Sequence, residues 1–192
     1  DTLLITGTAG NGWPKFFLLR PAPEGGLYYL TGELAQALDD AYGAIVAAAR
    51  QLGADSTAAP AATVPSAPAA DNIDAACPWV TLAEVAALLG EAVQRQAVAS
   101  ARGAGCKYIP QTEDAWVEAD DFSPTFESQG VLVGLMPTSG AQWLLSEFLS
   151  VIEESNTTVD EATFAALQAS VEAGAIEDAL RQLASLAIIA GE

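Results

Sequence analysis

The sequence predicts an α+β protein, in which a small antiparallel sheet is packed by helices. Three observations predict this fold class. Short apolar runs bounded by Gly and Pro occur in both halves of the chain, and apolar residues recur at helical spacing after them. The 192 residues are also 51% apolar, which is enough to bury a core. We expect an N-terminal strand–strand–helix unit and a C-terminal helical segment.

The N-terminal unit, residues 1–53, begins with strands. The strand candidates are short apolar runs separated by turn residues, at positions 3–6, 16–19 and 27–30. The segment Gly7–Lys15 has the glycine content of a phosphate-binding loop. A strand pattern follows it, however, where a phosphate loop requires the N-terminus of a helix. We therefore expect a hairpin turn in this segment.

A helix is predicted over residues 32–52, with Thr31 as its N-cap and Gly53 as its stop. Helical spacing puts seven apolar residues on one predicted inward face: Leu34, Leu38, Ala41, Tyr42, Ile45, Ala49 and Leu52. A unit of this size is too small to hold a core alone. We expect it to pack on the rest of the chain or on another chain.

Residues 54–72 are rich in Ala, Pro, Ser and Thr and predict an extended linker, which leaves 73–192 as a second domain. That domain begins with a helix at 82–89, preceded by the capping box Thr81–Glu84 and ended by Gly90. Its strand candidates are short runs of strand-forming residues, at 92–99, 106–109, 115–118 and 130–135.

The C-terminal segment predicts three helices. The first spans 142–154, with an inward face of Leu144, Leu145, Phe148, Val151 and Ile152. A second capping box, Thr158–Glu161, begins a helix that Gly174 ends, and the last helix spans about 175–189. No run of about 18 apolar residues occurs, so we expect no transmembrane segment.

Charge restricts the class of partner. The chain has 7 basic and 25 acidic residues, a net charge of −18, and no Lys or Arg lies between Lys107 and Arg181. Nucleic acids and anionic membrane surfaces are bound mainly through Lys and Arg, so we expect neither as a partner. The acidic surface is compatible with a protein partner, with self-assembly, with a divalent cation, or with solubility alone.

The residue inventory argues against common catalysis. The chain has no His and only two lysines, Lys15 and Lys107. Without His it lacks the usual general base near neutral pH and the commonest metal ligand, and Ser–His and Cys–His mechanisms are excluded. We therefore expect no enzymatic activity and no catalytic residues.

One acidic segment could bind Ca²⁺, which prefers carboxylate oxygens. Its candidate ligands are Asp114, Glu118, Asp120 and Asp121, although their spacing does not match an EF-hand loop. A solvated strand face is the alternative interpretation. Trp116 lies in the same segment and is the one tryptophan that we predict to be exposed for an interaction. We expect no other cofactor.

The two cysteines, Cys77 and Cys106, cannot form a four-ligand zinc site in a chain without His. An even pair in an acidic, His-free chain favours a disulfide and an oxidising compartment. Two separate buried thiols are the alternative.

The segment Cys77-Pro-Trp-Val-Thr-Leu-Ala-Glu-Val-Ala-Ala-Leu-Leu-Gly90, followed by Cys106-Lys-Tyr108, resembles a family of uncharacterised exported bacterial lipoproteins of actinobacterial type. The resemblance covers about 32 residues. It implies a Cys77–Cys106 disulfide, an extracytoplasmic location and a small sheet packed by helices. It supplies no catalytic residues. The sequence thus predicts a secreted or cell-surface protein that acts through protein contacts, as an accessory or structural subunit. The alternative is an extracytoplasmic binding module for Ca²⁺ or a small ligand.

Overall fold

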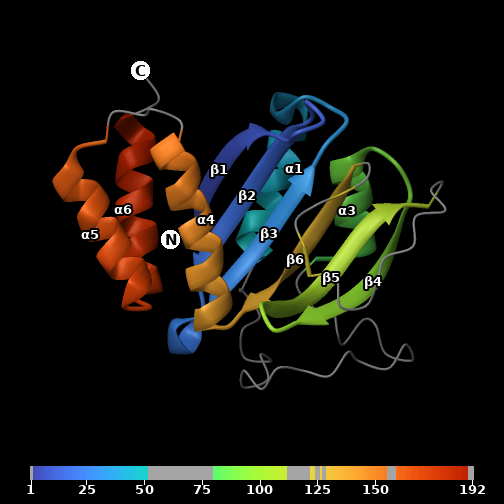
Figure 1. The fold of residues 1–192 in the computed structure, drawn as a ribbon. Helices are drawn as coiled ribbons and strands as arrows, with labels where there is room; N and C mark the ends of the chain where they lie inside the picture. Colours follow the sequence, from blue (N-terminus) through green and yellow to red (C-terminus); the bar gives the residue numbers. More distant parts are fainter. Residues whose placement is uncertain are drawn as a thin grey trace.

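The computed structural model describes residues 2–51, 80–111, 122–123, 126, 129–154 and 159–189. Within them, six strands form one antiparallel sheet in the order β1-β2-β3-β6-β5-β4, which confirms the predicted α+β class (Figure 1). The strands are β1 (Leu3–Thr8), β2 (Pro14–Pro21), β3 (Leu27–Glu33), β4 (Val93–Ser100), β5 (Gly103–Pro110) and β6 (Gly130–Met136).

The centre of the sheet joins the two halves of the chain. Strand β3 pairs with β6 over its whole length, from Leu27 opposite Met136 to Glu33 opposite Gly130. The N-terminal strands therefore pack edge to edge on the later ones, which supplies the support that a unit of this size requires. The predicted linker at 54–72 lies outside the described residues.

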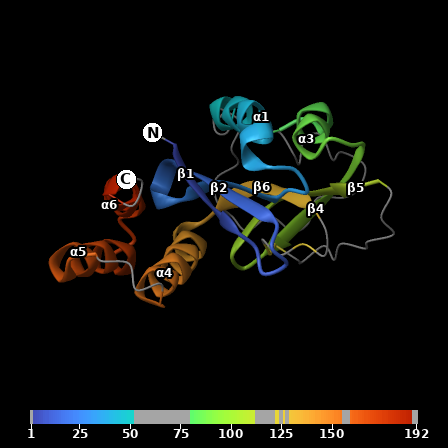
Figure 2. The same ribbon diagram turned by 90° about the horizontal axis from the view of Figure 1, so that it is seen from above.

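Helices cover both faces of the sheet (Figure 2). Helices α1 (Leu38–Gln51) and α3 (Leu82–Leu89) lie on one face, and α4 (Thr138–Glu154), α5 (Glu161–Glu172) and α6 (Ile176–Ile189) lie on the other. Each face has its own apolar core because side chains alternate along a strand. All seven residues of β3 are buried, with Tyr28 and Leu30 in the α1 and α3 core and Leu27 and Tyr29 in the other.

Helix α3 begins and ends where the sequence predicts. The Thr81 side chain accepts a hydrogen bond from the Glu84 amide, and the Glu84 carboxylate accepts one from the Thr81 amide. Gly90 closes the helix at φ 76°, a left-handed conformation that favours glycine. The predicted hairpin turn between β1 and β2 is also confirmed, since these strands pair from Leu3–Leu19 to Thr8–Pro14.

The predicted start of the first helix is wrong. Thr31 lies inside β3, where its hydroxyl donates to the Phe16 carbonyl at 2.7 Å instead of capping a helix. Strand β3 extends to Glu33 because neighbours pair with it on both sides, and α1 begins at Leu38. Tertiary pairing therefore overrides the local helical pattern at residues 32–33, and the Leu34 and Ala35 amides bond the Pro14 carbonyl and the Gln129 side chain instead of starting a helix.

Two residues predicted to face inward are exposed. Tyr42 on α1 is 57% exposed and Val151 on α4 is 62% exposed. The buried stripe of α1 is Ala41, Ile45 and Ala48, and each step of one residue turns the helix by about 100°. Tyr42 therefore lies beside that stripe and projects to solvent.

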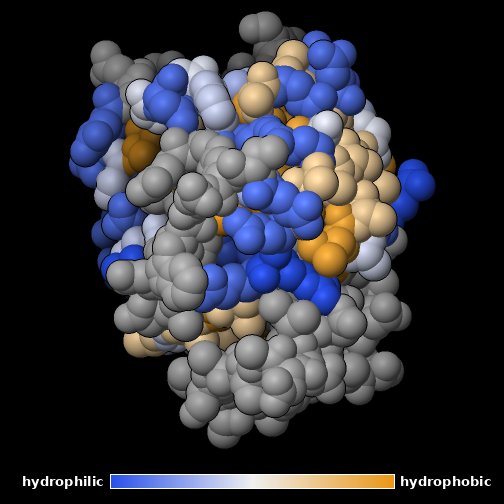
Figure 3. Space-filling view, turned by 90° about the vertical axis from the view of Figure 1, so that its right-hand side faces the viewer, coloured by the Kyte–Doolittle hydropathy of each residue, from blue (hydrophilic) through white to orange (hydrophobic). Residues whose placement is uncertain are grey.

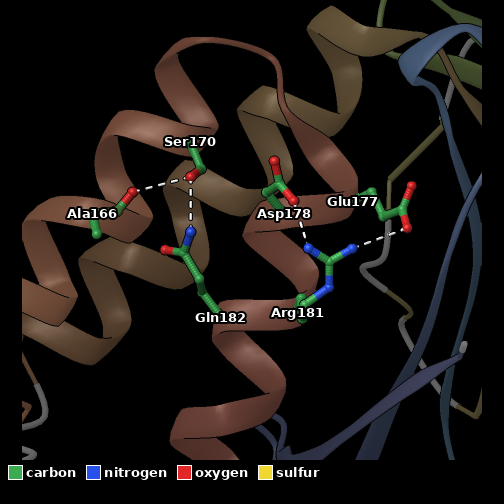
Figure 4. A network of polar contacts seen from close by, with 6 residues as sticks. All are labelled: Ala166, Ser170, Glu177, Asp178, Arg181 and Gln182. Carbon is green, nitrogen blue, oxygen red and sulfur yellow. Dashed lines mark hydrogen bonds and ion pairs between the residues drawn. The ribbon is translucent and has the colours of Figure 1, made fainter.

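Helices α5 and α6 form an antiparallel hairpin beside α4, in which α6 packs on strands β1 and β2. The N-cap of α5 is Asp160, whose carboxylate accepts from the Thr163 amide, so the predicted cap at Thr158 is wrong by two residues. A side-chain hydrogen bond joins the two helices (Figure 4): Gln182 Nε2 on α6 donates to Ser170 Oγ on α5 at 2.9 Å. Ser170 in turn donates to the Ala166 carbonyl within α5.

The N-terminus of α4 is held against the turn between β4 and β5. Gly140, in the first helical turn, approaches the Arg102 backbone so closely that a Cβ atom there would lie 1.9 Å from the Arg102 carbonyl oxygen. The Arg102 guanidinium stacks over the Trp143 ring, 3.8 Å from its centroid. This contact fixes the position at which α4 leaves the sheet.

Candidate functional site

A buried ion pair lies at the end of the sheet where β2 begins and β3 ends. Lys15 Nζ donates to Glu33 Oε1 at 2.9 Å, and the Glu33 side chain is only 5% exposed. The other carboxylate oxygen accepts a bond from Asn11 Nδ2, which lies in the turn between β1 and β2. Because both oxygens are engaged and the charge is compensated, this carboxylate fastens the hairpin and is not presented to a substrate.

A second polar cluster fastens the neighbouring loops. The buried Gln129 side chain accepts from the Ala35 amide at 3.3 Å and donates to the Glu91 carboxylate. The Gln36 side chain donates to the Leu88 carbonyl at 2.6 Å, which ties the segment after β3 to the C-terminus of α3. These contacts satisfy polar groups at the sheet end, as the burial of polar atoms requires.

Within the described parts of the chain, no group of three or more Cys, Asp or Glu side chains is arranged to hold a metal ion. The Ca²⁺ candidates Asp114, Glu118, Asp120 and Asp121 and the interaction candidate Trp116 all lie outside the described residues. Their roles stay predictions.

The predicted disulfide is described at one end only. Cys106 is fully buried in β5, in the core under α1 and α3, whereas Cys77 lies outside the described residues. Tyr108, on the same strand face as Cys106, donates its hydroxyl to the Val80 carbonyl at 2.8 Å. Burial raises the pKa of Tyr108, an effect that neighbouring Arg95 partly offsets, so the hydroxyl remains a hydrogen-bond donor. This bond anchors the chain entering α3 on the face that contains Cys106.

The solvent side of α1 and α3 is the most distinctive surface in the described structure. The exposed positions of α3, and those of α1 between its charged ends at Asp39, Asp40 and Arg50, carry no charge, and we name them the α1–α3 face: Tyr42, Gly43, Ala47, Leu82, Ala83 and Ala87. Tyr42 is 57% exposed and Leu82 is 39% exposed. In Figure 3, apolar residues gather along the right-hand side of the picture, where α3 lies. An apolar outward surface on two adjacent helices is typical of a contact surface.

The charged side chains on α6 form ion pairs that are exposed to solvent. Arg181 bonds Asp178 at 2.7 Å and Glu177 at 3.1 Å along the same helix (Figure 4). The Arg181 side chain is 66% exposed, so solvent screens both pairs and their contribution to stability is small. This network resembles an ordinary solvated helix face and not a binding site.

Sequence reasoning missed the α1–α3 face because it placed Tyr42 inward. A signal was nevertheless present in the sequence, since α3 contains a single charged residue, Glu84, over eight positions. A helix that is apolar on all sides is expected to be covered by protein on more than one side.

The comparisons with known proteins leave this chain without an assigned relative. None of the helices that the structure describes is long and apolar enough to cross a membrane. No family of known proteins, no curated protein and no solved structure matches the sequence.

Proposed function

We propose that this protein is a non-enzymatic exported or cell-surface protein that acts through protein–protein contacts, as an accessory or structural subunit of a surface or membrane-associated assembly. The observation that carries the proposal is the uncharged α1–α3 face. The charge of the whole chain is −18, so a patch of this kind stands apart from the rest of the molecule.

The surroundings of the α1–α3 face indicate the chemistry of the partner. Asp39 and Asp40 lie exposed in the first turn of α1 and Arg50 in its last turn, and Glu84 is half-buried in the first turn of α3, so acidic groups outnumber basic ones around the face. An apolar centre with a charged rim is the usual anatomy of a protein interface. The matching partner presents apolar side chains bordered by Lys or Arg, which would also be attracted over distance by the net charge.

The location outside the cytoplasm rests on the proposed Cys77–Cys106 disulfide. Val80, which receives the Tyr108 bond, is three residues after Cys77, and three extended residues span at most about 11 Å. Tyr108 and Cys106 are neighbours on one face of β5. This geometry supports the pairing, and structural disulfides occur mainly in oxidising compartments. Alkylation of native material under denaturing, non-reducing conditions tests it: two modified thiols would refute the disulfide.

Photo-crosslinking in the native source tests the contact surface. A photoreactive residue at Tyr42 should give a discrete adduct, whereas one at Glu147, exposed on α4 across the sheet, should not. The change Ala83→Glu places a charge in the α1–α3 face and should remove the Tyr42 adduct, while Ser146→Glu on α4 should leave it. No adduct from Tyr42, or equal adducts from both positions, would refute the proposed surface.

A further inference from the structure

The turn between β1 and β2 brings an amine and a carboxamide to one buried carboxylate. Lys15 Nζ donates to Glu33 Oε1 at 2.9 Å, and Asn11 Nδ2 donates to Glu33 Oε2 at 3.4 Å. The Glu33 side chain is 5% exposed and that of Lys15 is 17% exposed. The two nitrogen groups therefore meet across the two oxygens of a single carboxylate that is withdrawn from solvent.

The hairpin itself holds Asn11 in this position. The Ala9 amide donates to the Trp13 carbonyl at 2.8 Å, and the Gly12 amide donates to the Ala9 carbonyl at 2.9 Å, so the loop between the strands is three residues long. Gly12 has φ 86°, the left-handed conformation that ends a loop of this length. Asn11 lies in the exposed part of the turn, and its side-chain amide reaches inward to Glu33.

The arrangement contains the groups that an attack of the amine on the carboxamide requires. Glu33 contacts the attacking nitrogen and the leaving nitrogen, which is the position of a general base. The Trp13 amide donates to Asn11 Oδ1 at 3.0 Å, where negative charge develops when the neighbouring Cγ is attacked. The Phe17 ring lies 5.4 Å from Lys15 Nζ and contributes to the low exposure of the amine. Because the fold holds these groups together, the reaction is intramolecular and avoids the entropy cost of an encounter.

We propose that Lys15 and Asn11 form an isopeptide bond within this chain, without a second enzyme. Glu33 takes one proton from the Lys15 ammonium, and the neutral amine attacks Asn11 Cγ. The Nζ–Cγ bond forms, the Cγ–Nδ2 bond breaks, and the second amine proton goes to the leaving nitrogen, which departs as ammonia. The products are a neutral amide and a protonated Glu33. The step therefore balances without an oxidant, a reductant or a cofactor, and Glu33 is its catalytic residue.

A competing nucleophile lies next to Asn11 in the chain. The backbone nitrogen of the following residue, here Gly12, can attack the same Cγ atom and close a cyclic imide, which also releases ammonia. In this structure the Gly12 N–H is engaged in the turn, since it donates to the Ala9 carbonyl. Lys15, by contrast, shares Glu33 with the Asn11 amide. The geometry thus favours Lys15, and the experiment has to distinguish the two products.

The bond would close the end of the first hairpin permanently. Strand β1 pairs with β2 in the sheet, and the bond would join the turn to the beginning of β2. The Ala9 and Gly12 amides, which close the loop, should therefore exchange hydrogen more slowly in the parent than in a variant without the bond. An amide is not broken by reducing agents, which separates this bond from the proposed disulfide. The inference goes beyond the proposed function and does not involve the α1–α3 face.

Mass spectrometry of the folded chain tests the bond directly. The intact parent should be lighter than its sequence mass by one ammonia. After denaturation, reductive methylation should modify Lys107, the other lysine of the chain, and leave Lys15 unmodified. Trypsin should likewise cut after Lys107 and not after Lys15. A parent that keeps its full sequence mass, with both lysines labelled after prolonged incubation of the folded chain, would overturn the proposal.

Two matched variants identify the nucleophile and the base. Lys15→Arg keeps a cation beside Glu33 but replaces the amine with a guanidinium, so it should lose no ammonia. Glu33→Gln keeps the size of the side chain but removes the base, so it should also keep its full mass and a Lys15 that accepts the label. Ammonia loss that persists in Lys15→Arg would overturn the proposal, because it would identify Gly12 as the nucleophile. A bond that forms in Glu33→Gln as fast as in the parent would overturn the role of Glu33.

The parent measurements remain decisive if either variant does not fold, because labelling and digestion at Lys15 require no substitution. The result is also independent of photo-crosslinking at Tyr42, since neither variant alters the α1–α3 face.

Discussion

The same substitution, Gly to Ala, should have opposite effects on two helices. Gly43 lies in the interior of α1 at an exposed position, and a Cβ atom added there would meet nothing within 4 Å. Gly140 lies in the first turn of α4, and a Cβ atom there would lie 1.9 Å from the Arg102 carbonyl oxygen and 2.8 Å from its carbonyl carbon. The comparison separates helix propensity from tertiary packing.

The expected magnitudes follow from these distances. Gly43→Ala should raise the free energy of unfolding by about 0.5–1 kcal/mol, because Ala loses less backbone entropy in a helix. Gly140→Ala gains a similar propensity term, but the atom it would clash with is backbone and cannot rotate away. Overpacking costs about 1–3 kcal/mol or more, so the net effect should be destabilising. For a chain of this length, 1 kcal/mol corresponds to about 2–4 °C in Tm.

Urea unfolding followed by circular dichroism and by Trp fluorescence measures both variants against the parent. Trp143, which stacks on Arg102, should report loosening of this contact in Gly140→Ala before the global transition. A Gly140→Ala variant at least as stable as the parent would refute the close approach of α4 to the β4–β5 turn. A destabilised Gly43→Ala variant would refute the exposed placement of that position.

Three further predictions concern individual polar contacts. Glu33→Gln should lower the free energy of unfolding by about 1–3 kcal/mol, because it leaves the partly buried Lys15 ammonium without its counter-charge. In a double-mutant cycle, the double variant Lys15→Met with Glu33→Leu should lose less stability than the sum of the two single variants. Thr81→Ala should cost about 1 kcal/mol by removing the capping box of α3, measured by urea unfolding; no change would argue against that cap. Hydrogen bonds from Thr163 lower the pKa of Asp160, so its stabilising effect is present above the unfolded pKa of about 4 and is lost as pH falls through the folded pKa. Asp160→Asn, which also caps well, should therefore match the parent near pH 7 and lose less stability than the parent between about pH 5 and 2; identical acid profiles would contradict this.

The sequence by itself determined the bounds of those elements that begin or end through contacts between residues close together in the chain. The capping box Thr81–Glu84 and the stop at Gly90 placed α3 at its observed bounds because each of these bonds spans only a few residues. The glycine-rich turn before Lys15 placed the first hairpin, and Gly174, at φ 70°, separated the last two helices as predicted. The resulting α+β class was predictable for the same reason.

Only the tertiary structure decided how these elements combine. Strand β3 pairs with β6 from about a hundred residues later, and no local pattern encodes such a partner. That pairing kept Thr31 in a strand where the sequence suggested a helix cap, and the docking of α1 on the sheet chose which side of the helix faces inward, leaving Tyr42 in solvent. The α1–α3 face depends on these same choices, because a surface is defined by what the rest of the chain leaves uncovered.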